Sequence, residues 1–298
     1  MNTRPNSWLP LPKTDSPTIQ AMLAQMRNRL AQAGIDAAAL EARLLLGQVV
    51  GIDTVALIAH GEREIDPEAR ARAFDLTERR ASGQPMAYLL GQREFWSMSL
   101  QVNEHCLIPR PDTELLVALA LERLPAGKPR VLDLGTGSGA IILALKRERP
   151  DLDAWGSDLS GQALAVAARN ARALGLDVCW FQGCWLDAVP ALPAFDLIVS
   201  NPPYIDPADP HLKQGDLRFE PRAALVAPDH GLAALKAIAA AARPRLRPGG
   251  HLLLEHGFDQ AAAVRAMLAS RGFIEVCSHR DLAGHDRVSE GRSPDGSG

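Results

Sequence analysis

Four consecutive residues, Asn201, Pro202, Pro203 and Tyr204, follow the apolar segment 195–200. Proline has no backbone N–H and cannot continue a sheet ladder, so an expected strand must end here. The side chain of Asn201 offers a carbonyl acceptor, and Pro202 offers a backbone carbonyl without a competing donor. Two acceptors on a rigid turn can hold both N–H bonds of a planar –NH2 group, and Tyr204 can stack on it. The segment is therefore either a stiff exit turn or a device that holds a flat polar group for reaction.

The second interpretation suits a planar amide or exocyclic amine nitrogen, which is a weak nucleophile because its lone pair is delocalised. Methyl transfer to it from a sulfonium needs in-line approach and neither a metal nor a covalent intermediate. Well-oriented reactions reach effective molarities of about 10⁵–10⁸ M, so fixing the nitrogen supplies much of the barrier reduction. Acceptors aimed at the N–H bonds stabilise the developing positive charge. We expect catalytic roles for Asn201, Pro202 and Tyr204.

A glycine-rich segment, Gly135 to Gly139, lies between an apolar segment and an apolar helical pattern. Its G-x-G-x-G spacing differs from the G-x-G-x-x-G loop that binds a dinucleotide. Asp158 ends the next expected strand, 158 − 139 = 19 residues after the last glycine. A carboxylate there can hold both hydroxyls of a ribose, so the pair predicts a nucleoside-type cofactor. Trp185, after the third strand, is expected either to stack on the base or to pack in the core.

These residues need a scaffold, and from residue 130 onward strand and helix patterns alternate. The expected strands are 130–134, 153–158, 178–182, 195–200, 250–255, 273–278 and 286–290, with helices that include 139–147, 160–174, 231–244 and 258–271. Such alternation predicts an α/β fold with a mostly parallel sheet of about seven strands, covered on both faces.

The part before this sheet is different in character. Ser16 and Pro17 are typical of an N-cap and first helical residue, and further helices are expected from Asp36, Asp53 and Asp66. The expected domains are a flexible N-terminus at 1–15, a helical bundle at 16–85, a β-hairpin linker at 86–108, the main α/β domain at 109–291 and a disordered tail at 292–298.

Composition disfavours several classes of function. Among 298 residues, 32 basic and 35 acidic side chains give a net charge of −3, which disfavours a broad nucleic-acid-binding face. The four cysteines form no C-x-x-C pair and no two histidines have i, i+4 spacing, so we expect neither a zinc site nor disulfides. A signal peptide and a membrane-spanning run are also not expected, and these patterns favour a cytoplasmic protein.

The combination of "GTGSG", a following acid and "NPPY" resembles class I S-adenosylmethionine-dependent methyltransferases that modify a planar nitrogen. More narrowly, the chain is similar to the HemK/PrmC family, glutamine-N5 methyltransferases of class 1 peptide-chain release factors. The similarity covers nearly the whole chain, including "GQPMAYLLGQREFW", "LIPRPDTELLV", "FEPRAAL", "LRPGGHLLLEHGFDQ" and "DLAGHDRVSEGR". "NPPY" alone is shared with DNA adenine and cytosine-N4 methyltransferases, whereas "LIPRPDTE" is much more specific.

The resemblance implies a class I methyltransferase (Rossmann-like) fold, S-adenosylmethionine as the cofactor, S-adenosylhomocysteine as its product and no metal. The residues it implies for the cofactor are Gly135, Thr136, Gly137, Ser138, Gly139, Asp158, Trp185 and Asn201. It implies that Asn201, Pro202, Pro203 and Tyr204 hold the glutamine of a Gly-Gly-Gln loop in the release factor, with Arg110 and Pro111 in the same cleft.

One residue departs from the family pattern: many members carry an acid before the tryptophan, and here Cys184 precedes Trp185. This puts in doubt a hydrogen bond from an acid to the adenine amine, though not the stacking.

Several alternatives remain open at this stage. A glutamine methyltransferase of a ribosomal protein shares NPPY, and a DNA or RNA adenine-N6 methyltransferase would need base flipping and a basic groove. The long segment 205–225 is expected to be a flap that contacts the substrate, anchored by Glu220, or else a solvated linker. The helical bundle is expected to recognise the release factor. No membrane partner and no direct nucleic-acid substrate are expected.

Overall fold

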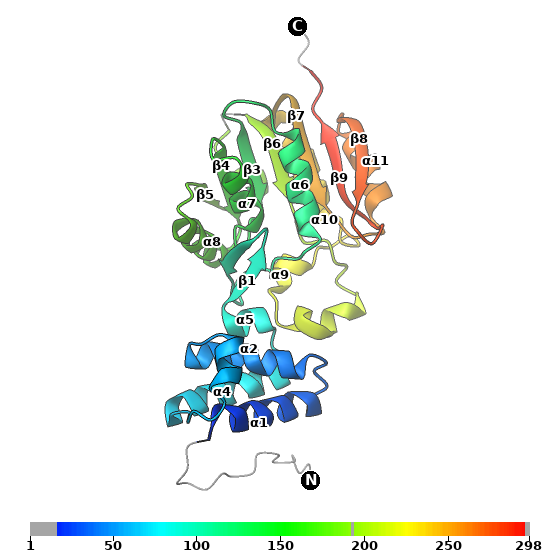
Figure 1. Cartoon of the computed structure of the whole chain (residues 1–298). Coiled ribbons are helices and arrows are strands. Elements are labelled where there is room, and N and C mark those ends of the chain that lie inside the picture. Colours follow the sequence, from blue (N-terminus) through cyan, green and yellow to red (C-terminus); the bar gives the residue numbers. More distant parts are fainter. Residues whose placement is uncertain (1–16, 192–193, 296–298) are drawn as a thin grey trace. The chain divides into compact units, whose positions relative to one another are not determined.

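The computed structural model describes residues 17–191 and 194–295. The chain divides into two compact units, one up to Gly91 and one from Gln92 onward (Figure 1). The expected flexible N-terminus at 1–15 lies outside the described residues.

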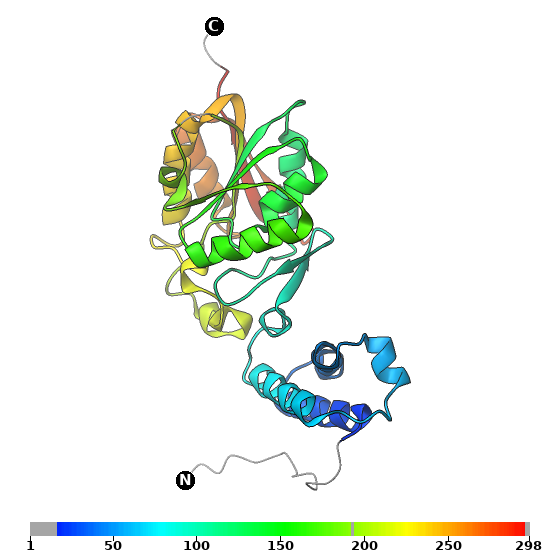
Figure 2. The ribbon, with the colours of Figure 1, turned by 90° about the vertical axis from the view of Figure 1, so that its left-hand side faces the viewer.

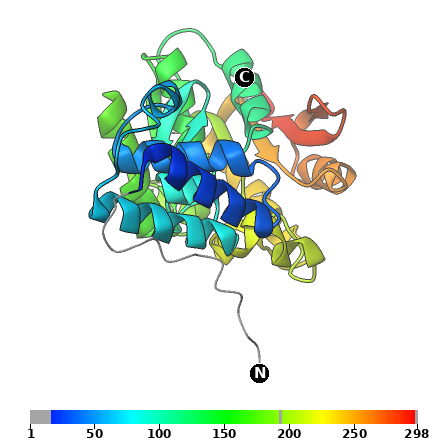
Figure 3. The same ribbon diagram turned by 60° about the horizontal axis from the view of Figure 1, so that its bottom comes forward.

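Within the described residues, the first unit is all-helical (Figure 3). Its helices are α1 (Ile19–Gln32), α2 (Ala38–Val50), α3 (Thr54–Ala59), α4 (Pro67–Ala81) and α5 (Met86–Leu90). The side chains of Asp53 and Asp66 accept hydrogen bonds from backbone N–H groups at the start of α3 and α4, as expected of N-caps. The start of α1 was predicted wrongly, because Thr18 caps this helix. Ser16 lies outside the described residues.

The prediction of a hairpin over 86–108 is also wrong for its first five residues. Met86–Leu90 forms α5, which Gly91 ends in the left-handed conformation (φ +70°). Leu89 is buried in the core of the helical unit, so this apolar run belongs to the first unit. The hairpin itself is shorter, with β1 (Gln92–Phe95) antiparallel to β2 (Met98–Gln101).

The second unit is built on a seven-stranded sheet of order β5-β4-β3-β6-β7-β9-β8. Its strands are β3 (Arg130–Leu134), β4 (Asp153–Asp158), β5 (Cys179–Gln182), β6 (Phe195–Ser200), β7 (Leu246–Glu255), β8 (Ile274–Arg280) and β9 (Asp286–Arg292). Strands β3 to β7 are parallel, and β9 runs antiparallel between β7 and β8. The predicted α/β class with a mostly parallel sheet of seven strands is confirmed.

Helices cover both faces of this sheet, and each face has its own apolar core (Figure 2). Helices α6 (Thr113–Arg123), α7 (Ala140–Glu148) and α8 (Gly161–Leu174) contribute to one core, and α10 (Ala233–Ala242) and α11 (Ala261–Ser270) to the other. The remaining short elements are η1 (Trp185–Ala188), η2 (Pro210–Lys213), η3 (Gly215–Arg218), α9 (Arg222–Leu225) and η4 (Arg243–Arg245).

Several strand limits differ from the expectation by a few residues, and two of the differences have a structural reason. Strand β7 begins at Leu246 rather than at residue 250, because its pairing with β6 continues across a register shift where Pro248 and two glycines suggested a loop. Strand β9 continues to Arg292, and Ser293 is buried with its N–H bonded to Gly250 O at 2.7 Å. The expected disordered tail therefore does not begin at 292, and residues 296–298 lie outside the described part.

Candidate active site

The strand register brings three of the predicted site residues and one further acidic residue into one row. Leu134 on β3 pairs with Ser157 on β4 and with Ser200 on β6, and Ser200 pairs in turn with Leu254 on β7. The residue that follows each of them is Gly135, Asp158, Asn201 and Glu255, respectively. Because these strands are parallel, all four lie at the carboxyl ends of neighbouring strands. This edge lies where the chain order of the sheet reverses, which is where open α/β sheets bind ligands.

The glycine loop turns tightly after β3. Gly135, Gly137 and Gly139 all have positive φ, at 71°, 57° and 86°. At Gly135 there is a second constraint, because an added Cβ would lie 3.3 Å from Cζ3 of Trp185. The indole of Trp185 therefore lies close against the loop backbone, and only glycine leaves this approach open.

Asp158 is fixed by backbone donors. One carboxylate oxygen accepts from Gly137 N at 2.9 Å and the other from Ser160 N at 2.8 Å. Burial raises the pKa of Asp158 above its ordinary value although these hydrogen bonds oppose the shift. Each oxygen keeps a second lone pair, so the carboxylate can still accept from a vicinal diol.

A pocket of about 350 Å³ opens between these parts. Its lining includes Gly135, Gly137, Asp158, Cys184, Trp185, Asn201 and Pro203, together with residues 104–107 and parts of α8 and α9. The volume lies within the range of about 300–1,000 Å³ that is usual for small-molecule sites. Sequence reasoning had grouped Thr136, Ser138 and Gly139 with the cofactor, but they are not among the residues that line this pocket.

Thr136 and Ser138 instead form hydrogen bonds that hold the glycine loop in place. Thr136 Oγ1 donates to Asp133 Oδ2 at 2.6 Å, and the carbonyl of Ser138 accepts from Asn170 Nδ2 at 2.9 Å. Asp133 is fully buried, its Oδ1 has no hydrogen-bond partner, and burial raises its pKa to about 7. Sequence reasoning missed Asp133, although a carboxylate inside an apolar strand directly before a glycine loop was a visible signal.

The observed features fit a nucleoside cofactor that carries positive charge. Two acidic side chains, Asp133 and Asp158, are buried or half-buried beside the glycine loop, and Trp185 offers a flat face where the pocket meets that loop. Acidic groups favour a cationic ligand, the glycines allow close approach to the backbone, and an indole suits a base.

Asn201 is held by Thr113, which in turn contacts Glu255, and sequence reasoning missed both residues. Its Nδ2 donates to Thr113 Oγ1 at 3.1 Å, and the Thr113 hydroxyl in turn hydrogen-bonds the side chain of Glu255. Thr113 and Glu255 are both buried. With the amide nitrogen engaged by Thr113, the carbonyl oxygen of Asn201 remains available as an acceptor. Thr113 belongs to "RPDTE" and Glu255 ends β7, but neither sequence position disclosed the chain of contacts from Asn201 through Thr113 to Glu255.

Tyr204 lies on the other side of Glu255. Its hydroxyl donates to Glu255 Oε1 over 3.4 Å, and burial together with this carboxylate raises the pKa of the phenol. The Tyr204 carbonyl accepts from Gln260 Nε2 at 3.0 Å, and a Cβ at Gly231 would lie 2.0 Å from that carbonyl oxygen. Glu255 itself is fully buried, which raises its pKa to about 7, and its Oε2 has no partner.

The remaining sequence candidates meet around Glu220. Its side chain is fully buried, accepts from Ile108 N at 3.1 Å and pairs with the guanidinium of Arg110. Glu220 therefore anchors the "FEPR" segment to the "LIPR" segment. Arg110 and Pro111 are not among the residues that line the pocket.

Comparisons with known proteins identify the family of the chain. Residues 21–91 match the PrmC N-terminal domain, and residues 112–215 match the methyltransferase small domain. The release factor glutamine methyltransferase of Salmonella typhimurium is 50% identical over 85% of this chain and 91% of that protein. The chain belongs to the release factor glutamine methyltransferase family. The family member from Bordetella pertussis is also 50% identical, over 89% of this chain and 98% of its own length.

The second unit also has the fold of more distant methyltransferases. A solved methyltransferase from Pyrococcus furiosus aligns with a TM-score of 0.51 at 17% identity, covering 66% of this chain and 89% of that protein. This likeness concerns the fold alone. Within residues 17–191 and 194–295, none of the helices has the length and apolarity needed to cross a bilayer.

Proposed function

We propose that this family member transfers a methyl group from S-adenosylmethionine to the side-chain nitrogen N5 of a glutamine, in the Gly-Gly-Gln loop of a class 1 release factor. The observation that carries the proposal is the orientation of Asn201. Its amide nitrogen is engaged by Thr113, so its carbonyl oxygen is available to accept from a group bound in the pocket that Asn201 lines. The names of relatives with 50% identity support the release factor as the substrate.

The pocket provides the cofactor site in this proposal. The backbone at Gly135 and Gly137 accepts the close approach of the ligand, Asp158 holds the ribose diol, and Trp185 stacks on the adenine. S-adenosylmethionine, when bound, supplies a methyl group on a sulfonium, which is electrophilic without a metal. Asn201 lies at the boundary between this site and the substrate, and it contacts both.

The residues of the NPPY segment act on the glutamine. The Asn201 Oδ1 and Pro202 carbonyl accept the two N–H bonds of the amide, while Pro203 and Tyr204 confine its plane. Acceptors on both N–H bonds stabilise the positive charge that grows on nitrogen as the N–C bond forms and the S–C bond breaks. The proton then leaves the methylated nitrogen. Because the turn is rigid and its amide is oriented through buried residues, little reorganisation is needed during reaction.

The helical unit and the rim segments complete the proposal. The helical unit docks the release factor, and the segment 205–225, tied to Ile108 and Arg110 through Glu220, covers the glutamine. Because release factors act in translation, the proposal implies a cytoplasmic location.

Labelled cofactor tests this function directly. The chain is incubated with labelled S-adenosylmethionine and, in turn, a release factor, ribosomal proteins and DNA, and the labelled residue is mapped by mass spectrometry. Label on the Gly-Gly-Gln glutamine supports the proposal. Label on a glutamine of a ribosomal protein would show that the substrate is a ribosomal protein and not a release factor. Label on adenine but not on glutamine would refute the proposal. Asn201→Ala should abolish transfer while cofactor binding largely survives.

A further inference from the structure

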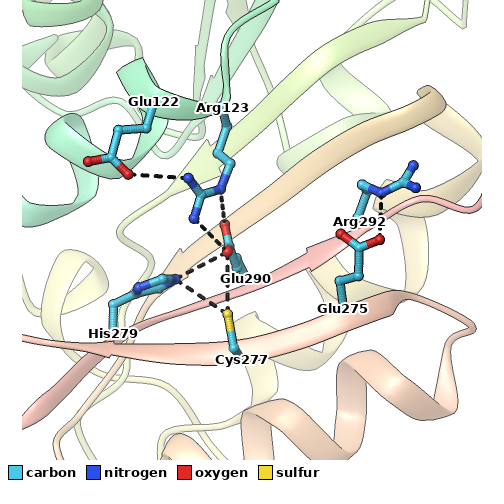
Figure 4. A network of polar contacts seen from close by, with 7 residues as sticks. All are labelled: Glu122, Arg123, Glu275, Cys277, His279, Glu290 and Arg292. Carbon is cyan, nitrogen blue, oxygen red and sulfur yellow. Dashed lines mark hydrogen bonds and ion pairs between the residues drawn. The ribbon is translucent and has the colours of Figure 1, made fainter.

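Three side chains capable of binding a metal converge on one face of strands β8 and β9 (Figure 4). Cys277 and His279 are two residues apart on β8, so they point to the same face. Glu290 on β9 is the cross-strand partner of Cys277. The sheet register therefore places a thiol, an imidazole and a carboxylate on a shared platform.

The atoms form a nearly equilateral triangle. The Cys277 Sγ lies 3.5 Å from His279 Nε2 and 3.3 Å from Glu290 Oε1, and these two atoms are 3.2 Å apart. Tetrahedral zinc with Zn–N and Zn–O bonds near 2.1 Å and Zn–S near 2.3 Å requires ligand separations of about 3.4 Å for N–O and about 3.6 Å for S–N or S–O. The observed separations differ from those required for tetrahedral zinc by about 0.3 Å or less.

A guanidinium supports the carboxylate from behind. Arg123 donates from Nε to Glu290 Oε2 and from Nη2 to Oε1, both at 2.9 Å. This pair lowers the pKa of Glu290, so the ligand is present as the anion. Glu122 lies 3.2 Å from Arg123 and offsets the positive charge of the guanidinium (Figure 4). A metal on Oε1 would leave the contact between Arg123 Nε and Oε2 intact, as an outer-shell bond that orients the ligand.

We propose that Cys277, His279 and Glu290 bind one Zn²⁺ ion, with the fourth position open to solvent. Binding forms the Sγ–Zn bond and releases the thiol proton to solvent. A hard cation such as Mg²⁺ or Ca²⁺ takes oxygen ligands, whereas a set of S, N and O suits zinc. His279 keeps 24% of its side-chain area exposed and Cys277 is half-buried, so the ion approaches from the side of these two residues, whereas the Glu290 side chain is only 8% exposed. The ion would join β8 to β9 independently of the methyl-transfer site.

The sequence pattern concealed this site. The expectation that zinc is absent rested on C-x-x-C pairs and on histidines at i, i+4 spacing. A Cys-x-His pair on one strand with its third ligand on the neighbouring strand has neither signature.

The test uses the full chain freed of metal by a chelator. Zn²⁺ is titrated by calorimetry, and Co²⁺ is added as a spectroscopic probe, because a cobalt–thiolate bond gives a charge-transfer band. We expect one ion per chain and, for Cys277→Ser and His279→Gln, affinity at least about tenfold weaker. The matched control is Cys179→Ser, since this thiol is exposed on β5 and lies outside the cluster. The control should keep both the stoichiometry and the band.

A second readout needs no variant. Zn²⁺ should slow alkylation of Cys277 in the unmodified chain, measured by mass spectrometry of the labelled peptides, and leave alkylation of Cys179 unchanged. Absence of zinc binding, a cobalt–thiolate band that persists in Cys277→Ser, or alkylation of Cys277 that zinc does not slow would overturn the proposal.

Discussion

The side-chain nitrogen of Asn201 donates to the hydroxyl of Thr113 over 3.1 Å. Thr113 begins α6, 88 residues before Asn201 in the chain, and its hydroxyl also reaches Glu255. The contact therefore decides which end of the Asn201 amide faces the pocket. Reversal of this amide would present a donor where the proposed glutamine needs an acceptor.

Thr113→Val tests this orientation. The substitution conserves shape, removes the hydroxyl and leaves the Asn201 amide without its partner. We expect kcat for glutamine methylation to fall about a hundredfold, which is the cost of a misplacement of about 1 Å. Calorimetric cofactor binding should be unchanged. Thr113→Ser keeps the hydroxyl and should restore most of the rate; equal losses in the two variants would rule out the orienting role.

Glu255 predicts a dependence of stability on pH. Burial raises its pKa from 4.5 to about 7, so the native state binds more protons than the unfolded state in this interval. The free energy of unfolding should therefore fall as pH rises from 4.5 to 7, by about 3 kcal/mol from this group at 1.36 kcal/mol per pH unit. Urea unfolding at several pH values measures the fall.

The matched variant for this prediction is Glu255→Gln, which cannot ionise. Its free energy of unfolding should fall less steeply over the same interval. Part of the slope remains in the variant, because burial also raises the pKa of Asp133 to about 7. Identical pH profiles for the variant and the unmodified chain would show that Glu255 does not titrate there.

Arg110 is expected to stabilise the rim of the site through Glu220. Arg110→Ala leaves the fully buried carboxylate with only the N–H of Ile108 as a partner. Removing one member of a buried ion pair costs about 3–5 kcal/mol, and the partial exposure of Arg110 places the expected loss near 3 kcal/mol. The double variant Arg110→Ala/Glu220→Gln removes the uncompensated charge and should recover much of it. A double variant less stable than Arg110→Ala would contradict this account.

Cys184 predicts an effect on cofactor affinity. It is exposed, lines the pocket and directly precedes Trp185. Cys184→Asp introduces a carboxylate that can accept from the adenine amine, so we expect modestly tighter binding of S-adenosylmethionine by calorimetry. Cys184→Asn, which is close in size but uncharged, serves as the control. No gain in the Asp variant would argue that the base amine lies elsewhere.

The helical unit should govern affinity for the protein substrate. A truncated chain must begin at Gln92 rather than near Met86, because α5 packs its Leu89 into the helical core. We expect this truncation to raise KM for the release factor while methylation of a short Gly-Gly-Gln peptide persists. An unaltered KM for the release factor would remove the docking role, and circular dichroism would verify that the truncated chain is folded.

Much of the fold could be predicted because its signals are local. Asp53 and Asp66 cap the helices they were expected to cap, and the limits of β3, β4 and β6 agree with the apolar runs that predicted them. The error at Met86–Leu90 arose because an apolar and aromatic run is compatible with a strand or a short buried helix, and packing against the helical unit decided between them.

The site was predictable only in part. Asn201 and Asp158 follow strands, so their place at the carboxyl edge could be inferred from the fold class. The support of Asn201 could not, because tertiary packing brings Thr113 to Asn201 and Glu255 to Thr113 from separate elements. The same reason hid the convergence of Cys277, His279 and Glu290, which depends on the register between two strands.

Strand order has a consequence for the synthesis of this protein. Strand β9 follows β8 in the chain but is inserted between β7 and β8, so this edge of β7 has no partner until β9 has been made. Strand β7 carries Glu255, and β9 contributes Arg287, which pairs with Asp112 directly before Thr113. During folding, the cofactor loop after β3 can therefore form before β9 is in place, whereas the ion pair of Arg287 with Asp112, beside Thr113, forms only once β9 has inserted.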